Sequence, residues 1–208
     1  MKLHRPISYL ITDGTSRPDT FEHDRRRIAD IGRKAVDQRV SMIQLREKGL
    51  PTRQLFELAG ELAEIVSGSE TRLLINDRAD IAAASGADGV HMTSRSLRAD
   101  DVRGAFGNEM LIGVSCHSAI DVELAAERGA DFAVFGPVFS TPGKFALGVE
   151  ALAAACTVRP EFTVLALGGV DASNVEQVLA AGARGAAAIR AMADDRLIRR
   201  LRELDGRE

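Results

Sequence analysis

The chain alternates short apolar runs with longer segments in which apolar residues recur at helical spacing. The first part reads ISYLIT at 7–12, a helical pattern at 25–38, VSMIQL at 40–45, a second helical pattern at 52–68 and RLLIN at 72–76. Such alternation is typical of βαβ units that build a parallel sheet. The same pattern predicts further strands at 88–92, 111–115, 131–136, 163–169 and 184–190, helices between them and a last helix at 194–204.

Eight predicted strands in 208 residues correspond to about 26 residues per βα unit, which is close to the minimum for a closed (β/α)8 barrel. Gly86, Gly129 and Gly182 each stand between a predicted helix and the next strand, where a helix end requires positive φ. Similar connections occur in open doubly wound sheets, so the number of strands decides the prediction. Because no linker or low-complexity stretch interrupts the pattern, we expect one TIM-barrel domain over residues 1–208.

Composition excludes some classes of partner. The formal net charge of −3 offers no broad basic surface for nucleic acid, so small molecules are the expected partners. No apolar run approaches the ~20 residues that cross a bilayer, and the N-terminus enters a strand-like run instead of a signal-peptide core. We therefore expect a cytoplasmic protein without a membrane partner. Cys116 and Cys156 have neither the number nor the spacing of a disulfide framework or zinc site, so both are expected to be reduced packing residues.

The loops that follow the strands form the active site of a barrel, and polar side chains collect at these positions. In QLREK the period of two places Gln44, Arg46 and Lys48 on one face of the strand. A guanidinium and an ammonium that converge at a strand end can hold a diphosphate. The alternative is an ion pair at the barrel rim, with Asp13 or Asp77 as the partner.

Asn76 and Asp77 follow the next apolar run and offer an amide and a carboxylate, the hard oxygen ligands that suit Mg²⁺ held partly by substrate phosphate. A helix N-cap is the alternative for Asp77, because a helical segment follows it. His91 and His117 are candidates for a general acid or base, although histidines at such positions are more often structural.

The long connection after the sixth strand, residues 136–144, contains glycines and prolines together with Ser140, Thr141 and Lys144. Backbone donors, hydroxyls and a cation suit an anion-binding or lid loop. Gly168 and Gly169 after the seventh strand and Arg190 after the eighth occupy the place where barrels commonly bind phosphate, next to a helix N-terminus.

These segments together resemble a known family. YLITD, QLREK, LLINDRADIAAASGADGVHM, GVSCHS, GADFAVFGPVFSTPGK and LALGGVDASNV occur in the order of the thiamine phosphate synthase and TenI family, over about residues 9–192. The combination of QLREK, INDR, GADGVH and FGPVF is specific to that family, although no single piece would be.

The resemblance implies a barrel in which an aminopyrimidine methyl diphosphate loses pyrophosphate and the resulting pyrimidine cation is captured by the ring nitrogen of a thiazole phosphate. It implies Mg²⁺ as the cofactor and, by analogy with dimers in the family, a homodimer. Carried over by position, it assigns the diphosphate to Arg46, Lys48, Asn76 and Lys144, the pyrimidine to Gln44 and Ser115, Mg²⁺ to Asp77, and the thiazole phosphate to Thr141 and the backbone around Gly169.

The chain departs from the synthase pattern at three positions. Ser96 stands where the family has its second metal-binding aspartate, Gly143 where synthases place a threonine, and Arg190 where they place a serine. The first departure is similar to TenI-type thiazole tautomerases, in which a histidine at the position of His117 acts as base. A barrel that binds a phosphorylated ligand without catalysis is a third hypothesis. The intact diphosphate clamp favours the synthase.

Overall fold

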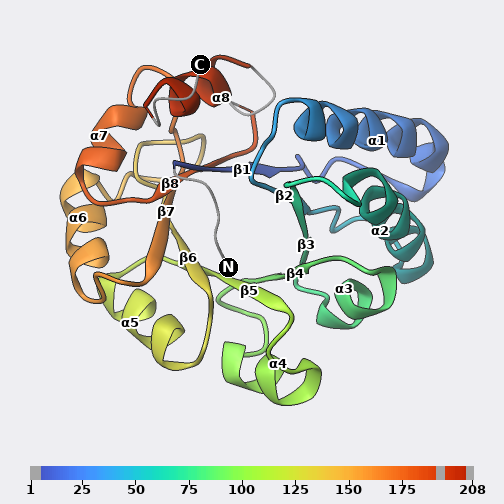
Figure 1. The fold of residues 1–208 in the computed structure, drawn as a ribbon, viewed down its shortest axis with the longest axis horizontal. Helices are drawn as coiled ribbons and strands as arrows, with labels where there is room; N and C mark the ends of the chain where they lie inside the picture. The colour runs from blue at the N-terminus through green and yellow to red at the C-terminus, as the bar shows by residue number, and fades with distance from the viewer. Residues whose placement is uncertain (1–5, 191–194, 205–208) are drawn as a thin grey trace.

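The computed structural model describes residues 6–190 and 195–204, in which eight parallel strands close into a barrel surrounded by helices (Figure 1). The predicted (β/α)8 barrel is therefore confirmed. The strands are β1 (Ile7–Ile11), β2 (Met42–Leu45), β3 (Arg72–Asn76), β4 (Gly89–Met92), β5 (Leu111–Cys116), β6 (Phe132–Phe135), β7 (Thr163–Leu167) and β8 (Gly185–Ala188). The helices are α1 (Phe21–Asp37), α2 (Thr52–Val66), α3 (Ala79–Ser85), α4 (Ala99–Phe106), α5 (Ala119–Glu127), α6 (Val149–Thr157), α7 (Val175–Ala180) and α8 (Asp195–Leu204).

Alternation along each strand divides the apolar residues into two layers. One set fills the inside of the barrel, and it includes Tyr9, Leu74 and Phe132 from three different strands. The residues of opposite parity, such as Ile43 and Ile75, pack outward against the helices. The barrel closes where Tyr9 on β1 pairs with Ala187 on β8. Most strand residues are thus buried on both faces of the barrel, and the exposed charged side chains of the site stand where the strands end.

The first helix begins four residues earlier than its apolar pattern predicted. α1 starts at Phe21 after a short 3₁₀ turn, and the Asp24 carboxylate accepts hydrogen bonds from the Thr20 hydroxyl at 2.6 Å and the Arg17 backbone N–H at 3.3 Å. These bonds satisfy groups at the helix entrance that hydrophobic periodicity does not report. In the part of the chain that the structure describes, no helix has the length and apolar character needed to cross a bilayer.

The repeated helix-to-strand connection has the predicted geometry. Gly86, Gly129 and Gly182 have φ values of 76°, 80° and 99°, which L side chains rarely adopt. At Gly182 a Cβ atom would also lie 3.0 Å from the Cβ of Cys156. Cys116 and Cys156 are both free thiols, and burial raises the pKa of Cys116 to about 12, which disfavours the thiolate form.

Candidate active site

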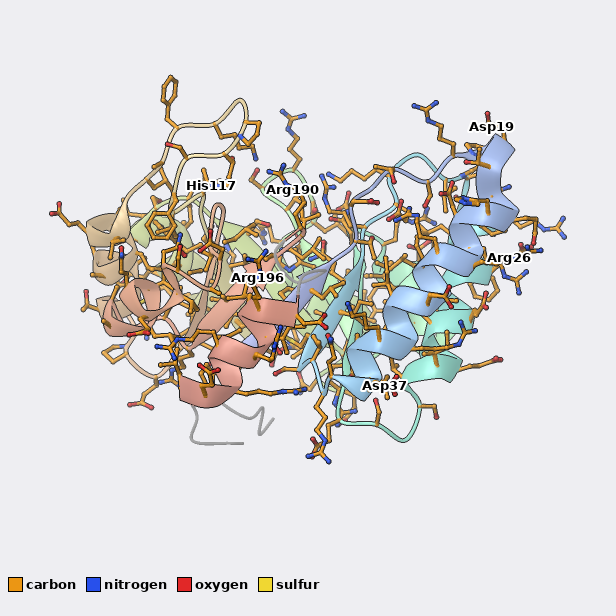
Figure 2. All side chains as sticks on the ribbon, turned by 90° about the horizontal axis from the view of Figure 1, so that it is seen from above. Asp19, Arg26, Asp37, His117, Arg190 and Arg196 are labelled. Atoms are coloured by element: carbon orange, nitrogen blue, oxygen red, sulfur yellow. The ribbon has the colours of Figure 1, made fainter. Side chains whose placement is uncertain are left out.

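The carboxyl-terminal parts of the strands and the loops that follow them carry the predicted site residues. Figure 2 shows His117 and Arg190 at this end of the barrel, the end toward which Asp19 also lies, whereas Asp37 at the end of α1 lies at the opposite end. The site divides into a group at the ends of β2–β5 and a cavity bounded by the ends of β6–β8.

The cations after β2 are not neutralised by neighbouring carboxylates. Arg46 is half-buried and Lys48 is exposed, and within the described residues neither has a carboxylate oxygen within 4.0 Å. Asp13, one of the two partners considered for a rim ion pair, pairs instead with Arg27 at 3.2 Å. The alternative of a barrel-rim ion pair is therefore wrong, and both positive charges are available to a ligand.

Glu47 supports Arg46 from the opposite face of the strand, a role that the sequence reasoning missed. Its buried carboxylate accepts hydrogen bonds from the backbone N–H groups of Gly14 at 3.2 Å and Ser16 at 2.9 Å. A Cβ atom at Gly14 would lie 2.9 Å from a guanidinium nitrogen of Arg46, so the loop passes directly against this side chain. The signal in the sequence was the position of Glu47 in QLREK, where the period of two places its carboxylate on the face opposite to Arg46 and Lys48.

Asp77 is not a helix cap. α3 begins at Ala79, its N-cap residue is Arg78 and no side chain caps it. The exposed Asp77 has φ of 65°, its N–H donates to the carbonyl of His91 at 2.9 Å, and its carboxylate has no hydrogen bond or ion pair within the described residues. A non-glycine residue at positive φ stores backbone strain, which is common at functional sites. Within the described residues the carboxylate thus has no hydrogen-bonded partner, although Arg78 interacts with it electrostatically, and it stands next to the buried Asn76.

These oxygens can hold Mg²⁺ only with help from a ligand. Among the described residues, no group of three or more His, Cys, Asp or Glu side chains is placed to bind a metal ion. One carboxylate and one amide fit Mg²⁺ when phosphate oxygens and water complete the octahedron, since Mg²⁺ usually keeps several such ligands.

A row of hydrogen bonds crosses the barrel interior below the site. Gln44 Nε2 donates to Tyr9 Oη at 2.8 Å, Tyr9 Oη lies 3.3 Å from His91 Nδ1, and His91 Nε2 lies 2.9 Å from Ser115 Oγ. Burial lowers the pKa of His91 to about 3, so its ring is neutral near pH 7. Gln44 and Ser115, predicted separately, are brought together by Tyr9, which sequence reasoning did not single out.

A cavity of about 580 Å³ opens between the ends of β6, β7 and β8. The predicted residues that line it supply two cations, an imidazole, a hydroxyl and the backbone of two glycines. They are His117, Thr141, Lys144, Gly168, Gly169 and Arg190. Arg190 and Lys144 are exposed and form no ion pair within the described residues. The sequence also predicted a helix N-terminus next to this site. Residues 191–194, which follow Arg190, lie outside the described residues, and α7, the helix that follows β7, begins at Val175.

The two glycines after β7 are required by close contacts. Gly168 and Gly169 have φ of 96° and 65°. A Cβ at Gly168 would lie 2.5 Å from Pro137 Cα, and one at Gly169 would lie 2.7 Å from Phe139 Cβ. Without side chains, this backbone can pack under the β6–α6 loop and face the cavity.

His117 is held in one tautomer. Its Nδ1 lies 2.5 Å from the carbonyl oxygen of Gly136, and because a carbonyl only accepts, Nδ1 carries a proton. When the ring carries only this proton, Nε2 is an acceptor facing the cavity, which suits a base.

The chain matches the family model described as thiamine monophosphate synthase over residues 8–192. It belongs to that family. A putative thiamine-phosphate synthase of Geobacter sulfurreducens is 42% identical over 191 residues, covering 90% of this chain and 86% of the relative. The thiamine-phosphate synthase of Mycolicibacterium smegmatis is 35% identical, covering 93% and 88%. The structure of a thiamine phosphate pyrophosphorylase from Pyrococcus furiosus superposes with a TM-score of 0.83 at 27% identity, covering 99% of this chain and 98% of that one.

Two departures from the synthase family pattern have local structural explanations. Ser96 Oγ accepts from the Thr93 backbone N–H at 2.8 Å and bonds the Thr93 hydroxyl at 2.9 Å, so it closes the turn after β4. Gly143 has φ of 77° in a turn in which Lys144 N–H donates to the Thr141 carbonyl at 2.9 Å. Proline at the second position and glycine at the third are the signature of a type II turn, which a threonine at 143 would strain.

Proposed function

We propose that this chain is a thiamine-phosphate synthase that joins an aminopyrimidine methyl diphosphate to a thiazole phosphate and releases pyrophosphate. The observation that carries the proposal is the pair of unneutralised cations, Arg46 and Lys48, at the end of β2. Diphosphate departure places negative charge on the leaving group, and cations that no protein carboxylate neutralises stabilise it.

The leaving diphosphate is assigned to the cationic groups of both halves of the site. Arg46 offers a planar fork supported by Gly14, and Lys48 offers a point charge. Asn76 adds an amide at the end of β3, and Lys144 brings a cation from the β6–α6 loop. As the bond to the pyrimidine methylene breaks, these groups stabilise the negative charge of the departing diphosphate. The ring nitrogen of the thiazole then attacks the methylene carbon of the resulting pyrimidine cation.

The pyrimidine is assigned to Gln44 and Ser115, the two ends of the interior row of hydrogen bonds. The thiazole phosphate is assigned to the β6–β8 cavity. Thr141 and the backbone of Gly168 and Gly169 supply donors there, and Arg190 supplies a guanidinium in place of the family's serine.

Mg²⁺ is proposed as the cofactor, held by Asp77 with support from Asn76. When bound, it would reduce the negative charge of the diphosphate and so ease its departure. The free Asp77 carboxylate supports this assignment, and the lack of a second carboxylate in the turn closed by Ser96 means that metal should enter together with substrate.

Thiazole isomerisation is the second candidate activity, favoured by one observation. The hydrogen bond from His117 Nδ1 to the Gly136 carbonyl leaves Nε2 as an acceptor in the cavity that we assign to the thiazole phosphate. The uncompensated cations after β2 have no evident role in a tautomerase, so we rank this activity second.

Incubation of the purified protein with both substrates and Mg²⁺ tests the proposal. We expect thiamine phosphate and pyrophosphate in equal amounts. Thiazole isomerisation without coupling would support the tautomerase instead, and ligand binding without turnover of either kind would support a non-catalytic barrel. Omission of the pyrimidine diphosphate is the matched control, because isomerisation needs only the thiazole.

A further inference from the structure

The interior row of Gln44, Tyr9, His91 and Ser115 has a direction that follows from its hydrogen-bonding groups. An amide nitrogen only donates, so Tyr9 Oη accepts from Gln44 Nε2 at 2.8 Å. The Tyr9 proton then needs an acceptor, and its other hydrogen-bond partner within the described residues is His91 Nδ1 at 3.3 Å. Nδ1 is therefore unprotonated.

A neutral imidazole has one N–H, and in His91 it must lie on Nε2. This N–H donates to Ser115 Oγ at 2.9 Å. Ser115 has thereby accepted a bond, and its own proton is left for an acceptor outside the row. At the other end, Gln44 Oε1 accepts no hydrogen bond from the described residues, so it is left for a partner outside the row.

We propose that this row is a directional hydrogen-bond relay in which Tyr9 and His91 are positioning residues, setting Ser115 as a donor and Gln44 as an acceptor toward the substrate. The identity of that substrate rests on the proposed synthase function. An aminopyrimidine carries an amine donor and ring-nitrogen acceptors at different positions of the ring, which suit an acceptor at Gln44 on β2 and a donor at Ser115 on β5. A ring with the reverse order of donor and acceptor would leave both protein groups unpaired, which costs affinity.

The burial of the row explains why its polarity can be maintained. Tyr9 is fully buried and His91 is 3% exposed, so water is not available to exchange partners along the row. Phe132 on β6 packs edge-on against the Tyr9 ring, with centroids 5.7 Å apart, and holds the phenol in place without a polar group.

The opposite polarity makes a distinct prediction. If the Gln44 amide were rotated, its oxygen would accept from Tyr9, His91 would carry its proton on Nδ1, and Ser115 would donate to His91. The tautomer of His91 therefore reports the direction of the relay without any substrate.

The first measurement is ¹⁵N NMR of the histidine rings in the free full-length protein near pH 7. The chain has four histidines, and the His91 signals are assigned by their loss in His91→Gln. We expect a proton on Nε2 and none on Nδ1. In Tyr9→Phe, which removes the donor to Nδ1, we expect the population of the Nδ1–H tautomer to rise. A proton on Nδ1 in the unsubstituted protein would overturn the proposal.

The second measurement separates positioning from packing. Tyr9→Phe should raise KM for the pyrimidine diphosphate by about tenfold, the size of one neutral hydrogen bond, and leave KM for the thiazole phosphate unchanged. His91→Leu should also raise KM for the pyrimidine diphosphate and leave KM for the thiazole phosphate unchanged. In His91→Gln both KM values should stay close to those of the unsubstituted protein, because the new amide can donate to Ser115.

Phe132→Leu is the matched control, because it loosens the packing around Tyr9 without changing a hydrogen bond. It should lower stability and leave KM for the pyrimidine unchanged. Equal effects of Tyr9→Phe on both substrates, or equal effects of Phe132→Leu and Tyr9→Phe on the pyrimidine, would reject the relay. If the unsubstituted protein showed the expected tautomer and no synthase activity, the proposed function would fail while the direction of the relay stood.

Discussion

On the β2–β5 side of the site, Gln44 and His91 are 1% and 3% exposed and belong to one row of hydrogen bonds inside the barrel. On the β6–β8 side, the cavity is covered by an irregular loop in which Phe145 is 96% exposed and the turn is closed by backbone bonds between Thr141 and Lys144. One side is positioned by buried side chains from the strands, and the other by glycine backbone and loop geometry.

The difference corresponds to the chemistry that each side is proposed to handle. A flat neutral ring is recognised by donors and acceptors of fixed direction, and buried strand residues supply them. A phosphate is recognised by charge and by backbone N–H groups, which need close approach of the chain and hence glycine. Substitutions should therefore act through hydrogen-bond direction or charge on the first side and through backbone strain on the second.

The largest expected effect is the loss of a cation on the β2 side. Arg46→Ala should lower kcat by about 10²–10³-fold, comparable to deletion of a donor that stabilises developing negative charge. Steady-state kinetics with both substrates measure this. Arg26→Ala removes the same charge from the outer face of α1, away from Arg190 and the site (Figure 2), and should leave kcat unchanged. Unchanged turnover in Arg46→Ala would remove this residue from the mechanism.

On the β7 side, Gly169→Ala should destabilise the protein by about 2–4 kcal/mol, from an unfavourable φ of 65° and from the contact of the new Cβ with Phe139. Gly86→Ala is the control, because Gly86 has φ of 76° with no atom within 4 Å of the added Cβ. Gly86→Ala should therefore lower stability only through the unfavourable φ, by about 1–2 kcal/mol. Urea denaturation gives both values, and equal losses would contradict the packing argument.

The buried imidazole should make stability depend on pH. The folded pKa of His91 is about 3 and the ordinary value is 6.5, so between these values the unfolded chain binds the extra proton. The contribution of His91 to the free energy of unfolding is fully present above about pH 6.5. It is lost as the pH falls, and the loss should reach about 2 kcal/mol at pH 5.

Denaturation of the unsubstituted protein and of His91→Gln at pH 7 and pH 5 isolates this contribution. Tyr9, the titratable group in contact with the ring, has a pKa that burial raises and does not change charge in this range. Both proteins also share Asp24, Asp80 and Asp171, whose lowered pKa values make them titrate at lower pH. Parallel pH dependence in the two proteins would show that His91 is not kept neutral.

The smallest expected effect concerns the metal. With Asp77 as the one assigned carboxylate, Mg²⁺ should bind the free protein weakly, and substrate should tighten Mg²⁺ binding by the factor by which Mg²⁺ tightens substrate binding. Ser96→Asp should raise Mg²⁺ affinity of the free protein about tenfold, roughly 1.4 kcal/mol, whereas Ser94→Asp in the same loop should not. Calorimetry measures this. If Mg²⁺ bound tightly without substrate and Asp77→Asn did not change its affinity, the metal site would not be at Asp77.

The sequence by itself determined the barrel, the approximate bounds of its eight strands and the strand ends at which polar residues collect. Each of these depends on local periodicity or on a local turn, as at Gly86 and Gly143. The resemblance to a family added roles for these residues, and the comparisons confirm the family. The roles of the individual site residues, the homodimer and the location in the cell remain predictions.

Only the tertiary structure decided which side chains act together. Tyr9 and His91 are 82 positions apart, and Glu47 reaches backbone groups 31 and 33 positions away, so no local pattern could pair them. The free carboxylate of Asp77 likewise depends on a left-handed backbone conformation at the end of β3, where local sequence equally favoured a helix cap. The physical reason is that strand periodicity places each residue on a face, whereas closure of the barrel determines which residues from other strands meet it there.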